Sequence, residues 1–158
     1  PTVLKYYGVK EGDVLVLINV NGINAMTIDA ALYARQIGAK IIAITSVNFS
    51  KAVPLGIAAR HSSNQNLYEL ADIVIDINIP AGDALLQIEG LEQKIGAGST
   101  YAVCFAGNLM CIRACEILVE RGVTPPIWTS LNIKGGDEAN REHMDKYLQK
   151  VHHLYPTF

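Results

Sequence analysis

Short apolar runs alternate along this chain with segments whose apolar residues recur at helical spacing. Residues 14–19 and 40–45 are continuous β-branched runs that are too short for helices, so each predicts a strand buried on both faces. We expect the first to be a central strand of a parallel sheet. Residues 71–76 contain a third apolar run, and residues 84–88 are a candidate for a short fourth strand.

A helix is predicted directly after the first strand, because Ile28, Ala31 and Leu32 fall on one helical face. Gly38 is placed to end that helix. The order of strand, glycine-containing loop and helix, followed by further strands, predicts an α/β fold with a doubly wound parallel sheet.

Two more helices and one crossover complete the predicted organisation. Residues 50–70 are rich in loop-forming residues, with a short helical turn at 67–70. Residues 99–121 carry the strongest helical pattern, and we expect this helix to pack on the sheet. Residues 138–153 form the final predicted helix, with Asp137 placed to cap its free amides.

Length and charge restrict the class of protein. The chain has 158 residues, half of them apolar, which favours one globular domain over residues 1–158. Its 13 Lys and Arg residues against 15 Asp and Glu give a net charge of -2 at pH 7 without a basic cluster, so we expect no nucleic-acid partner. The longest uninterrupted apolar runs are far shorter than the roughly 20 residues that cross a bilayer, so we expect no membrane partner.

The three cysteines, Cys104, Cys111 and Cys115, all lie in one predicted helix. A disulfide there would make no long-range link, which favours a reducing, cytoplasmic setting. We expect these thiols in the apolar core, because no nearby Cys or His completes a four-ligand site around Cys111 and Cys115. The sequence therefore predicts no metal site and no cofactor.

The best candidate for a binding site follows the first strand. Ligands of open parallel sheets bind beyond the carboxyl ends of the strands, where loops and helix N-termini converge. At Asn21-Gly22, the glycine permits close backbone approach, and the amides of Ile23, Asn24 and Ala25 are placed to face an anion. The alternative is an ordinary Asn-Gly turn, although helical rather than strand periodicity follows it.

Hydroxyl groups occur at two other predicted element ends. Thr45 and Ser46 end the second strand, where they are placed to donate to the same ligand or only to cap the next turn. Ser99 and Thr100 open the long helix, and Ser99 is also a good N-cap.

Together these residues resemble the sugar isomerase (SIS) domain family over nearly the whole chain. The motifs are Gly12-Asp13, the loop ending Asn21-Gly22-Ile23-Asn24, Gly38-Ala39-Lys40 and Ile42-Ala43-Ile44-Thr45-Ser46. Further segments are similar to a subfamily of predicted phosphosugar-binding SIS proteins: Arg60-His61, Leu67-Tyr68-Glu69, Ala71-Asp72, Glu89-Gly90-Leu91-Glu92, Pro125-Pro126 and Gly135-Gly136-Asp137-Glu138-Ala139-Asn140.

The resemblance implies a flavodoxin-like, three-layer αβα fold and a phosphate held by the loop after residues 14–18. Where the family usually carries Ser-x-Ser-Gly-x-Thr, this chain reads Asn19-Val20-Asn21-Gly22-Ile23-Asn24. An Asn amide donates N–H bonds, but its carbonyl oxygen repels an anion. Candidate phosphosugar-binding residues are Asn19, Asn21, Gly22, Ile23, Asn24, Thr45, Ser46, Ser99 and Thr100.

Two residues are candidates for catalysis, because sugar isomerisation needs a base that moves a proton between adjacent carbons. Glu89 lies in a glycine-rich loop, where a solvated carboxylate is the alternative. His61 carries an imidazole that can accept and donate a proton, with an ordinary surface role as its alternative.

We therefore expect a protein that binds a phosphorylated sugar or other carbohydrate derivative, with aldose-ketose isomerase activity as one possible role. The alternative is a non-catalytic regulatory or interaction module that has lost its hydroxyl-rich loop. The resemblance also implies a homodimer. It places a helix and a strand before Gly12, so we expect this chain to be the C-terminal portion of a longer polypeptide.

Overall fold

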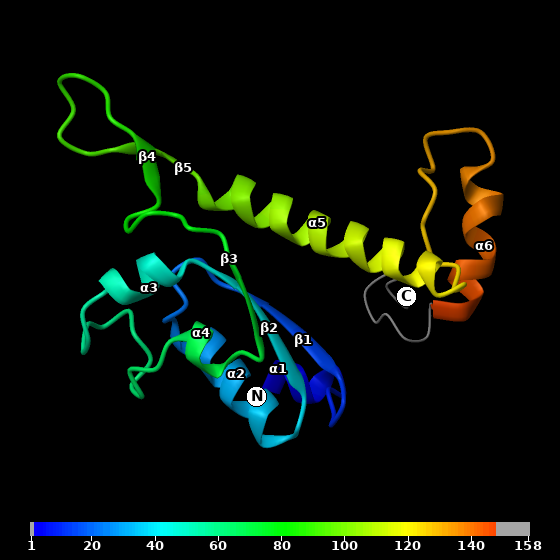
Figure 1. Cartoon of the computed structure of the whole chain (residues 1–158), viewed down its shortest axis with the longest axis horizontal. Coiled ribbons are helices and arrows are strands. Elements are labelled where there is room, and N and C mark those ends of the chain that lie inside the picture. The colour runs from blue at the N-terminus through cyan, green and yellow to red at the C-terminus, as the bar shows by residue number, and fades with distance from the viewer. Residues whose placement is uncertain (1, 148–158) are drawn as a thin grey trace. The chain divides into compact units, whose positions relative to one another are not determined.

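A parallel sheet of three strands organises the first part of the chain in the computed structural model, which describes residues 2–147. The strands are β1 (Val14–Ile18), β2 (Lys40–Thr45) and β3 (Ile73–Asp76), in the order β1-β2-β3 (Figure 1). All three run parallel, with Val16 opposite Ile42 and Ile42 opposite Ile73. The prediction of an α/β fold with a parallel sheet is confirmed.

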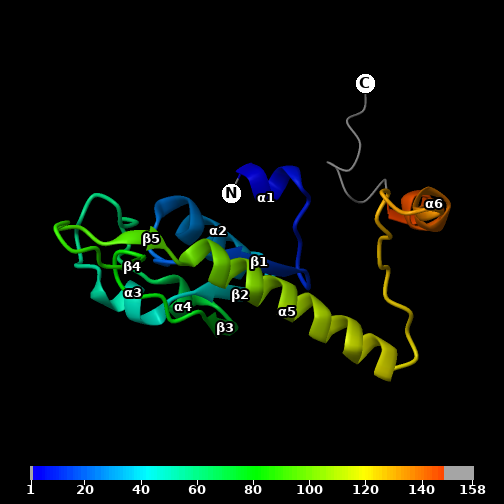
Figure 2. The ribbon, with the colours of Figure 1, turned by 90° about the horizontal axis from the view of Figure 1, so that it is seen from above.

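Helix α2 (Ala25–Gln36) covers one face of this sheet, as Figure 2 shows from above. Its buried residues Ile28, Ala31 and Ala34 pack against the β2 residues Ile41 and Ala43. The short helix α4 (Leu67–Leu70) adds two leucines to the same core. The predicted helix, its end near Gly38 and the turn at 67–70 are confirmed; Gly38 has a φ of +78°, which suits glycine.

The other elements are shorter or lie outside this core. They are α1 (Thr2–Tyr6), α3 (Val47–Ala52), the antiparallel pair β4 (Ala84–Leu86) and β5 (Ile95–Ala97), α5 (Ser99–Glu120) and α6 (Gly136–Tyr147). The candidate fourth strand exists, but it pairs in a separate two-stranded sheet. The predicted helix at 138–153 is present up to residue 147, and its remainder lies outside the described residues. Asp137 stands inside the first turn of α6 rather than before it.

The structure corrects the prediction that the first strand is central and buried on both faces. β1 is an edge strand within the described sheet. Its residues alternate, because Leu15 and Leu17 pack against the core while Val14, Val16 and Ile18 are exposed. Ile73 of β3, on the same face, is also exposed. The face opposite α2 is therefore largely uncovered by residues 2–111.

The chain divides into two units, Pro1–Cys111 and Ile112–Phe158, which we describe separately. In the first, the opening turns of α5 carry the exposed aromatic residues Tyr101 and Phe105. In the second, Asn140 of α6 is buried, and its side chain exchanges two hydrogen bonds of 2.7 Å with the backbone of Thr129. These two bonds fasten α6 to the segment before it.

Helix α5 differs from the sequence-based expectations. It has no buried residue among those described, and Cys104 and Cys111 are exposed rather than in a core. By length and composition alone, α5 is long and apolar enough to cross a membrane. The polar residues that interrupt its apolar runs do not lower the mean hydropathy of α5 enough to exclude a membrane span. The expectation of no membrane partner is therefore not confirmed.

Candidate functional site

The loop after β1 closes on itself through one backbone hydrogen bond and one bond to a side chain. The Gly22 N–H donates to the Asn19 carbonyl at 3.1 Å, and the Ile23 N–H donates to Asn21 Oδ1 at 3.3 Å. Gly22 has a φ of +59°, a conformation that an L side chain rarely adopts. The backbone N–H groups of Gly22 and Ile23, two candidate ligand residues, are therefore already hydrogen-bonded within the loop.

Two buried hydroxyl groups, those of Thr45 and Ser50, hold this loop from behind, and a third, that of Ser46, bonds elsewhere. Thr45 Oγ1 donates to the Val20 carbonyl at 3.3 Å, and Ser50 Oγ lies 2.8 Å from the Asn21 carbonyl. Ser46 Oγ donates to the Ile79 carbonyl at 2.7 Å and accepts from Phe49 N–H, so Ser46 caps α3. Thr45 and Ser46, which are candidate ligand residues, thus bond to backbone carbonyls and are fully buried.

The N-terminus of α2 begins at the end of the same loop. Asn24 is its N-cap residue, but the Asn24 side chain makes no cap hydrogen bond. That side chain instead accepts from Asn19 Nδ2 at 3.0 Å and donates to the Ala59 carbonyl at 3.3 Å. The first turn of α2 lacks a side-chain cap and keeps the positive end of a 12-residue helix dipole.

Asn19 leaves one polar atom unmatched. Its Oδ1 is buried and has no hydrogen-bond partner among the described residues. A buried carbonyl oxygen without a donor costs roughly 1–3 kcal/mol. This oxygen therefore favours a hydrogen-bond donor and disfavours an anion.

The start of α5 is already occupied by a carboxylate of the same chain. Asp83 Oδ1 accepts from the backbone N–H groups of Gly98, at 3.1 Å, and Ser99, at 2.8 Å. Ser99 Oγ donates to Asp83 Oδ2 at 2.6 Å. The Ser99 hydroxyl, a candidate phosphate ligand, thus bonds to a negative charge that a phosphate would have to displace.

An open pocket of about 350 Å³ lies between the end of β1 and the start of α5. The residues that line it are Ile18, Asn19, Val20, Ser99, Thr100, Val103 and Cys104. The structure therefore brings Asn19 together with Ser99 and Thr100, although these residues are distant in the sequence. Asn21, Gly22 and Ile23 do not line this pocket.

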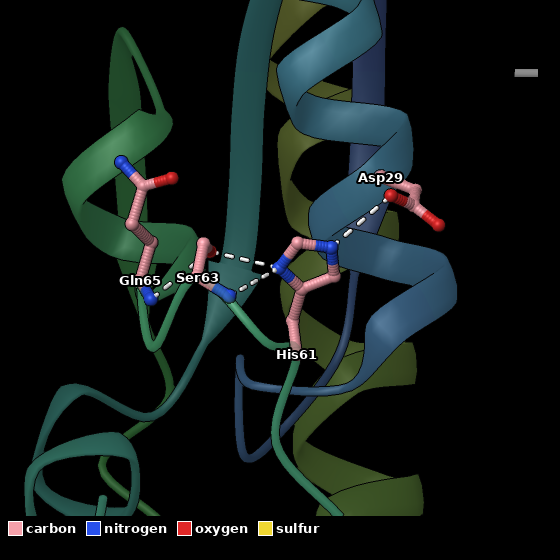
Figure 3. A network of polar contacts seen from close by, with 4 residues as sticks. All are labelled: Asp29, His61, Ser63 and Gln65. Carbon is pink, nitrogen blue, oxygen red and sulfur yellow. Dashed lines mark hydrogen bonds and ion pairs between the residues drawn. The ribbon is translucent and has the colours of Figure 1, made fainter. Parts of the chain in front are cut away.

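His61 lies against the candidate loop and belongs to a polar network. Its backbone N–H donates to the Ile23 carbonyl at 2.9 Å. Its ring lies between Asp29 of α2 and Ser63 of the following turn, as Figure 3 shows, with Nε2 3.2 Å from Asp29 Oδ1 and Nδ1 2.8 Å from Ser63 Oγ. His61 is thus more than a surface residue, whereas Glu89 is exposed in the β4–β5 connection.

Arg60 is a residue whose importance the sequence analysis missed. Only 7% of it is exposed, and its guanidinium donates five hydrogen bonds, four to backbone carbonyls and one to Asn66 Oδ1. Among those carbonyls are Ser50 and Val53. Arg60 therefore fixes the crossover that carries His61. The proline and glycine content of residues 50–70 marked a loop but gave no signal of its buried centre.

Comparison with known proteins relates the first part of this chain to SIS domains. A model of the SIS domain matches residues 1–46, which include β1, the candidate loop, α2 and β2. The recognition of the SIS domain family is confirmed, and an SIS domain suggests binding of a carbohydrate derivative.

More particular similarity is found to UPF0309 proteins. One from Brucella anthropi is 40% identical over 152 residues, covering 96% of this chain and 60% of that relative. Relatives from Oceanobacillus iheyensis and Listeria monocytogenes are 38% and 37% identical, each covering 92% of this chain and 58% and 60% of their own lengths. The chain thus spans about 60% of the length of these curated relatives, and their family name specifies no activity.

Proposed function

We propose that this protein binds a phosphorylated sugar or related carbohydrate derivative at the carboxyl end of β1. The observation that supports this most is the pocket of about 350 Å³ lined by Asn19, Ser99 and Thr100, beside the SIS-type loop. The pocket offers amide and hydroxyl groups for sugar hydroxyls. The uncapped first turn of α2 offers a favourable site for the phosphate.

In the proposed complex, Asn21, Gly22 and Ile23 shape the loop, because the backbone N–H groups of Gly22 and Ile23 already bond within it, and Asn24 leads into the first turn of α2. Thr45 and Ser46 contribute by holding the loop from behind, since the Thr45 hydroxyl and the Ser46 backbone N–H both donate to the Val20 carbonyl. Aldose-ketose isomerisation is the candidate reaction, with His61 and Glu89, which both lie outside the pocket lining, as candidate bases. The Asp29 carboxylate orients the His61 ring.

A second candidate is a non-catalytic regulatory or interaction module. The specific observation in its favour is the closure of the loop by the Asn21 side chain and the Ser50 hydroxyl, together with Asp83 occupying the start of α5. The Asn residues at positions 19 and 21, where the family usually carries Ser, also favour a non-catalytic module.

The proposal includes a cytoplasmic homodimer with the three-layer αβα arrangement, formed by a single domain that is part of a longer protein. The exposed apolar residues Val14, Val16, Ile18 and Ile73 support this arrangement, because an SIS-type sheet is covered on both faces. Sedimentation velocity tests the dimer, and only monomer at micromolar concentration would contradict it.

A thermal-shift panel of hexose and heptose phosphates tests binding. A ligand present at 100 times its dissociation constant adds about 2.7 kcal/mol to the free energy of unfolding, which raises Tm measurably. Replacing Asn19 with Ala should abolish the shift, whereas Glu92→Ala, in the β4–β5 connection and outside the pocket lining, should preserve it. Absence of a shift with every sugar phosphate would favour the non-catalytic module, whose partner would then be a macromolecule.

A further inference from the structure

The tautomer of His61 follows from its neighbours. The Ser63 backbone N–H donates to His61 Nδ1 at 3.0 Å, and a backbone amide can only donate. Nδ1 therefore carries no proton. In the neutral ring the proton is on Nε2, which donates to Asp29 Oδ1 at 3.2 Å.

This tautomer defines the direction of the next hydrogen bond. Ser63 Oγ lies 2.8 Å from Nδ1. Because Nδ1 is an acceptor, the Ser63 hydroxyl must be the donor. The same Oγ also accepts from the Gln65 N–H at 3.3 Å, a contact that fixes the position of the Ser63 hydroxyl (Figure 3).

The network therefore combines the parts that activate a serine. An unprotonated ring nitrogen faces the hydroxyl proton, and a carboxylate on the far side of the ring stabilises the imidazolium that would form. The His61 side chain is only 15% exposed, whereas Ser63 is exposed and open to a reagent from solvent. Ser62, its exposed neighbour, has no hydrogen bond to the His61 ring among the described contacts.

We infer that Ser63 is an activated nucleophile that accepts an acyl group from an activated ester. In this step the Ser63 Oγ forms a bond to the acyl carbon while its proton moves to His61 Nδ1, and the hydrogen bond from the Ser63 backbone N–H to Nδ1 is broken. The tetrahedral adduct then collapses, the bond between the acyl carbon and the leaving oxygen breaks, and the proton on Nδ1 passes to the leaving group. The products are acyl-Ser63 and an alcohol or phenol, with His61 neutral again.

Asp29 acts in this step as a positioning residue. Its carboxylate holds the proton on Nε2, which leaves the Nδ1 lone pair toward Ser63. An Asn at this position could donate to Nε2 and so stabilise the opposite tautomer, in which Nδ1 is protonated and cannot act as a base. This activity is separate from carbohydrate binding, because the five residues it uses or compares lie outside the pocket lining.

The test is acetylation of the intact 158-residue chain by p-nitrophenyl acetate, followed by peptide mapping. We expect the acetyl group on Ser63 in preference to Ser62, and Ser62→Ala should react at the unchanged rate. His61→Asn should slow acetylation of Ser63 by about 100-fold, the usual contribution of a general base. Asp29→Asn should slow it by about tenfold or more, and Asp29→Glu should restore part of the rate.

The outcomes separate clearly. Equal acetylation of Ser62 and Ser63, or a Ser63 rate unchanged by both His61→Asn and Asp29→Asn, would overturn the inference. If circular dichroism shows that His61→Asn fails to fold, the test rests on the Ser63 acetylation rates of Asp29→Asn and Asp29→Glu, because Asp29 is exposed. If Ser63 is not acetylated selectively, the thermal shifts caused by sugar phosphates should be unaffected. The acetylation test and the test of the proposed function are therefore independent.

Discussion

Replacing Gly22 with Ala tests whether the glycine is required by the packing of the protein itself. A Cβ at this position would lie 2.8 Å from both Ser50 Oγ and Thr45 Oγ1, a distance that real Cβ atoms essentially never show. Both hydroxyl groups are fully buried and bonded to carbonyls of the loop. Neither side chain can move without breaking a buried hydrogen bond.

The expected loss has two parts. The left-handed backbone at φ +59° costs a non-glycine residue about 1–2 kcal/mol. Overpacking against a tightly packed interior adds about 1–3 kcal/mol. Gly22→Ala should therefore lower the free energy of unfolding by about 2–5 kcal/mol.

Gly56→Ala is the matched control. Gly56 has a similar φ of +75°, but no atom lies within 4 Å of its added Cβ in the described structure. This variant should show only the backbone part of the loss, about 1–2 kcal/mol. The effect of alanine on the unfolded chain is shared by both variants and cancels in the comparison.

Urea denaturation followed by circular dichroism measures both losses, with unchanged m-values as the condition for comparing them. Gly22→Ala should be less stable than Gly56→Ala by the packing part alone. Equal losses would refute the reasoning, because they would mean that Ser50 and Thr45 yield to the new methyl group without cost.

Two further predictions concern single carboxylates. Asp83→Asn should lower the free energy of unfolding by about 1 kcal/mol, because the carboxylate accepts three hydrogen bonds at the start of α5; Glu89→Gln, on an exposed loop, is the control, and an unchanged Tm for Asp83→Asn would contradict this role. The pKa of Asp72 is lowered from 3.8, first by the hydrogen bond from the Ile41 N–H and then by that from Lys40. A folded-state pKa below the unfolded value means that this stabilisation is present above about pH 4 and is lost as the pH falls through the folded pKa. Tm should therefore fall more steeply below about pH 4 in the parent protein than in Asp72→Asn, and parallel curves would exclude the effect.

The elements that could be predicted from the sequence are those with a continuous or periodic pattern. Residues 40–45 form β2 with the predicted bounds, because this strand has neighbours on both sides and is covered by α2. Helix α3 was missed, since six residues between polar loops are too few to show a helical period. The exposure of β1 could not be predicted either, because a continuous apolar run is the same whether one face or both are covered within the chain.

Only part of the candidate site could be predicted, because contacts between distant loops leave no local pattern in the sequence. The sequence showed hydroxyl groups at the end of β2 and indicated both of their roles, binding and capping. It could not show that a carboxylate from the β4 region, Asp83, reaches the start of α5. Nor could it show that Arg60 donates to carbonyls spread over the crossover. Such contacts depend on loop conformation, which local periodicity does not encode.

The chemistry of Asn19 narrows what the pocket would bind. Its buried Oδ1 has no donor within residues 2–147, so the closed loop is not fully satisfied by itself. A sugar hydroxyl that donates to this oxygen, once the Asn19 side chain has turned it toward the pocket, would recover roughly 1–3 kcal/mol, whereas a phosphate oxygen there would be repelled. The positive end of α2, by contrast, favours the anion. We therefore expect a bound sugar phosphate to present a hydroxyl group to Asn19 and its phosphate to the first turn of α2.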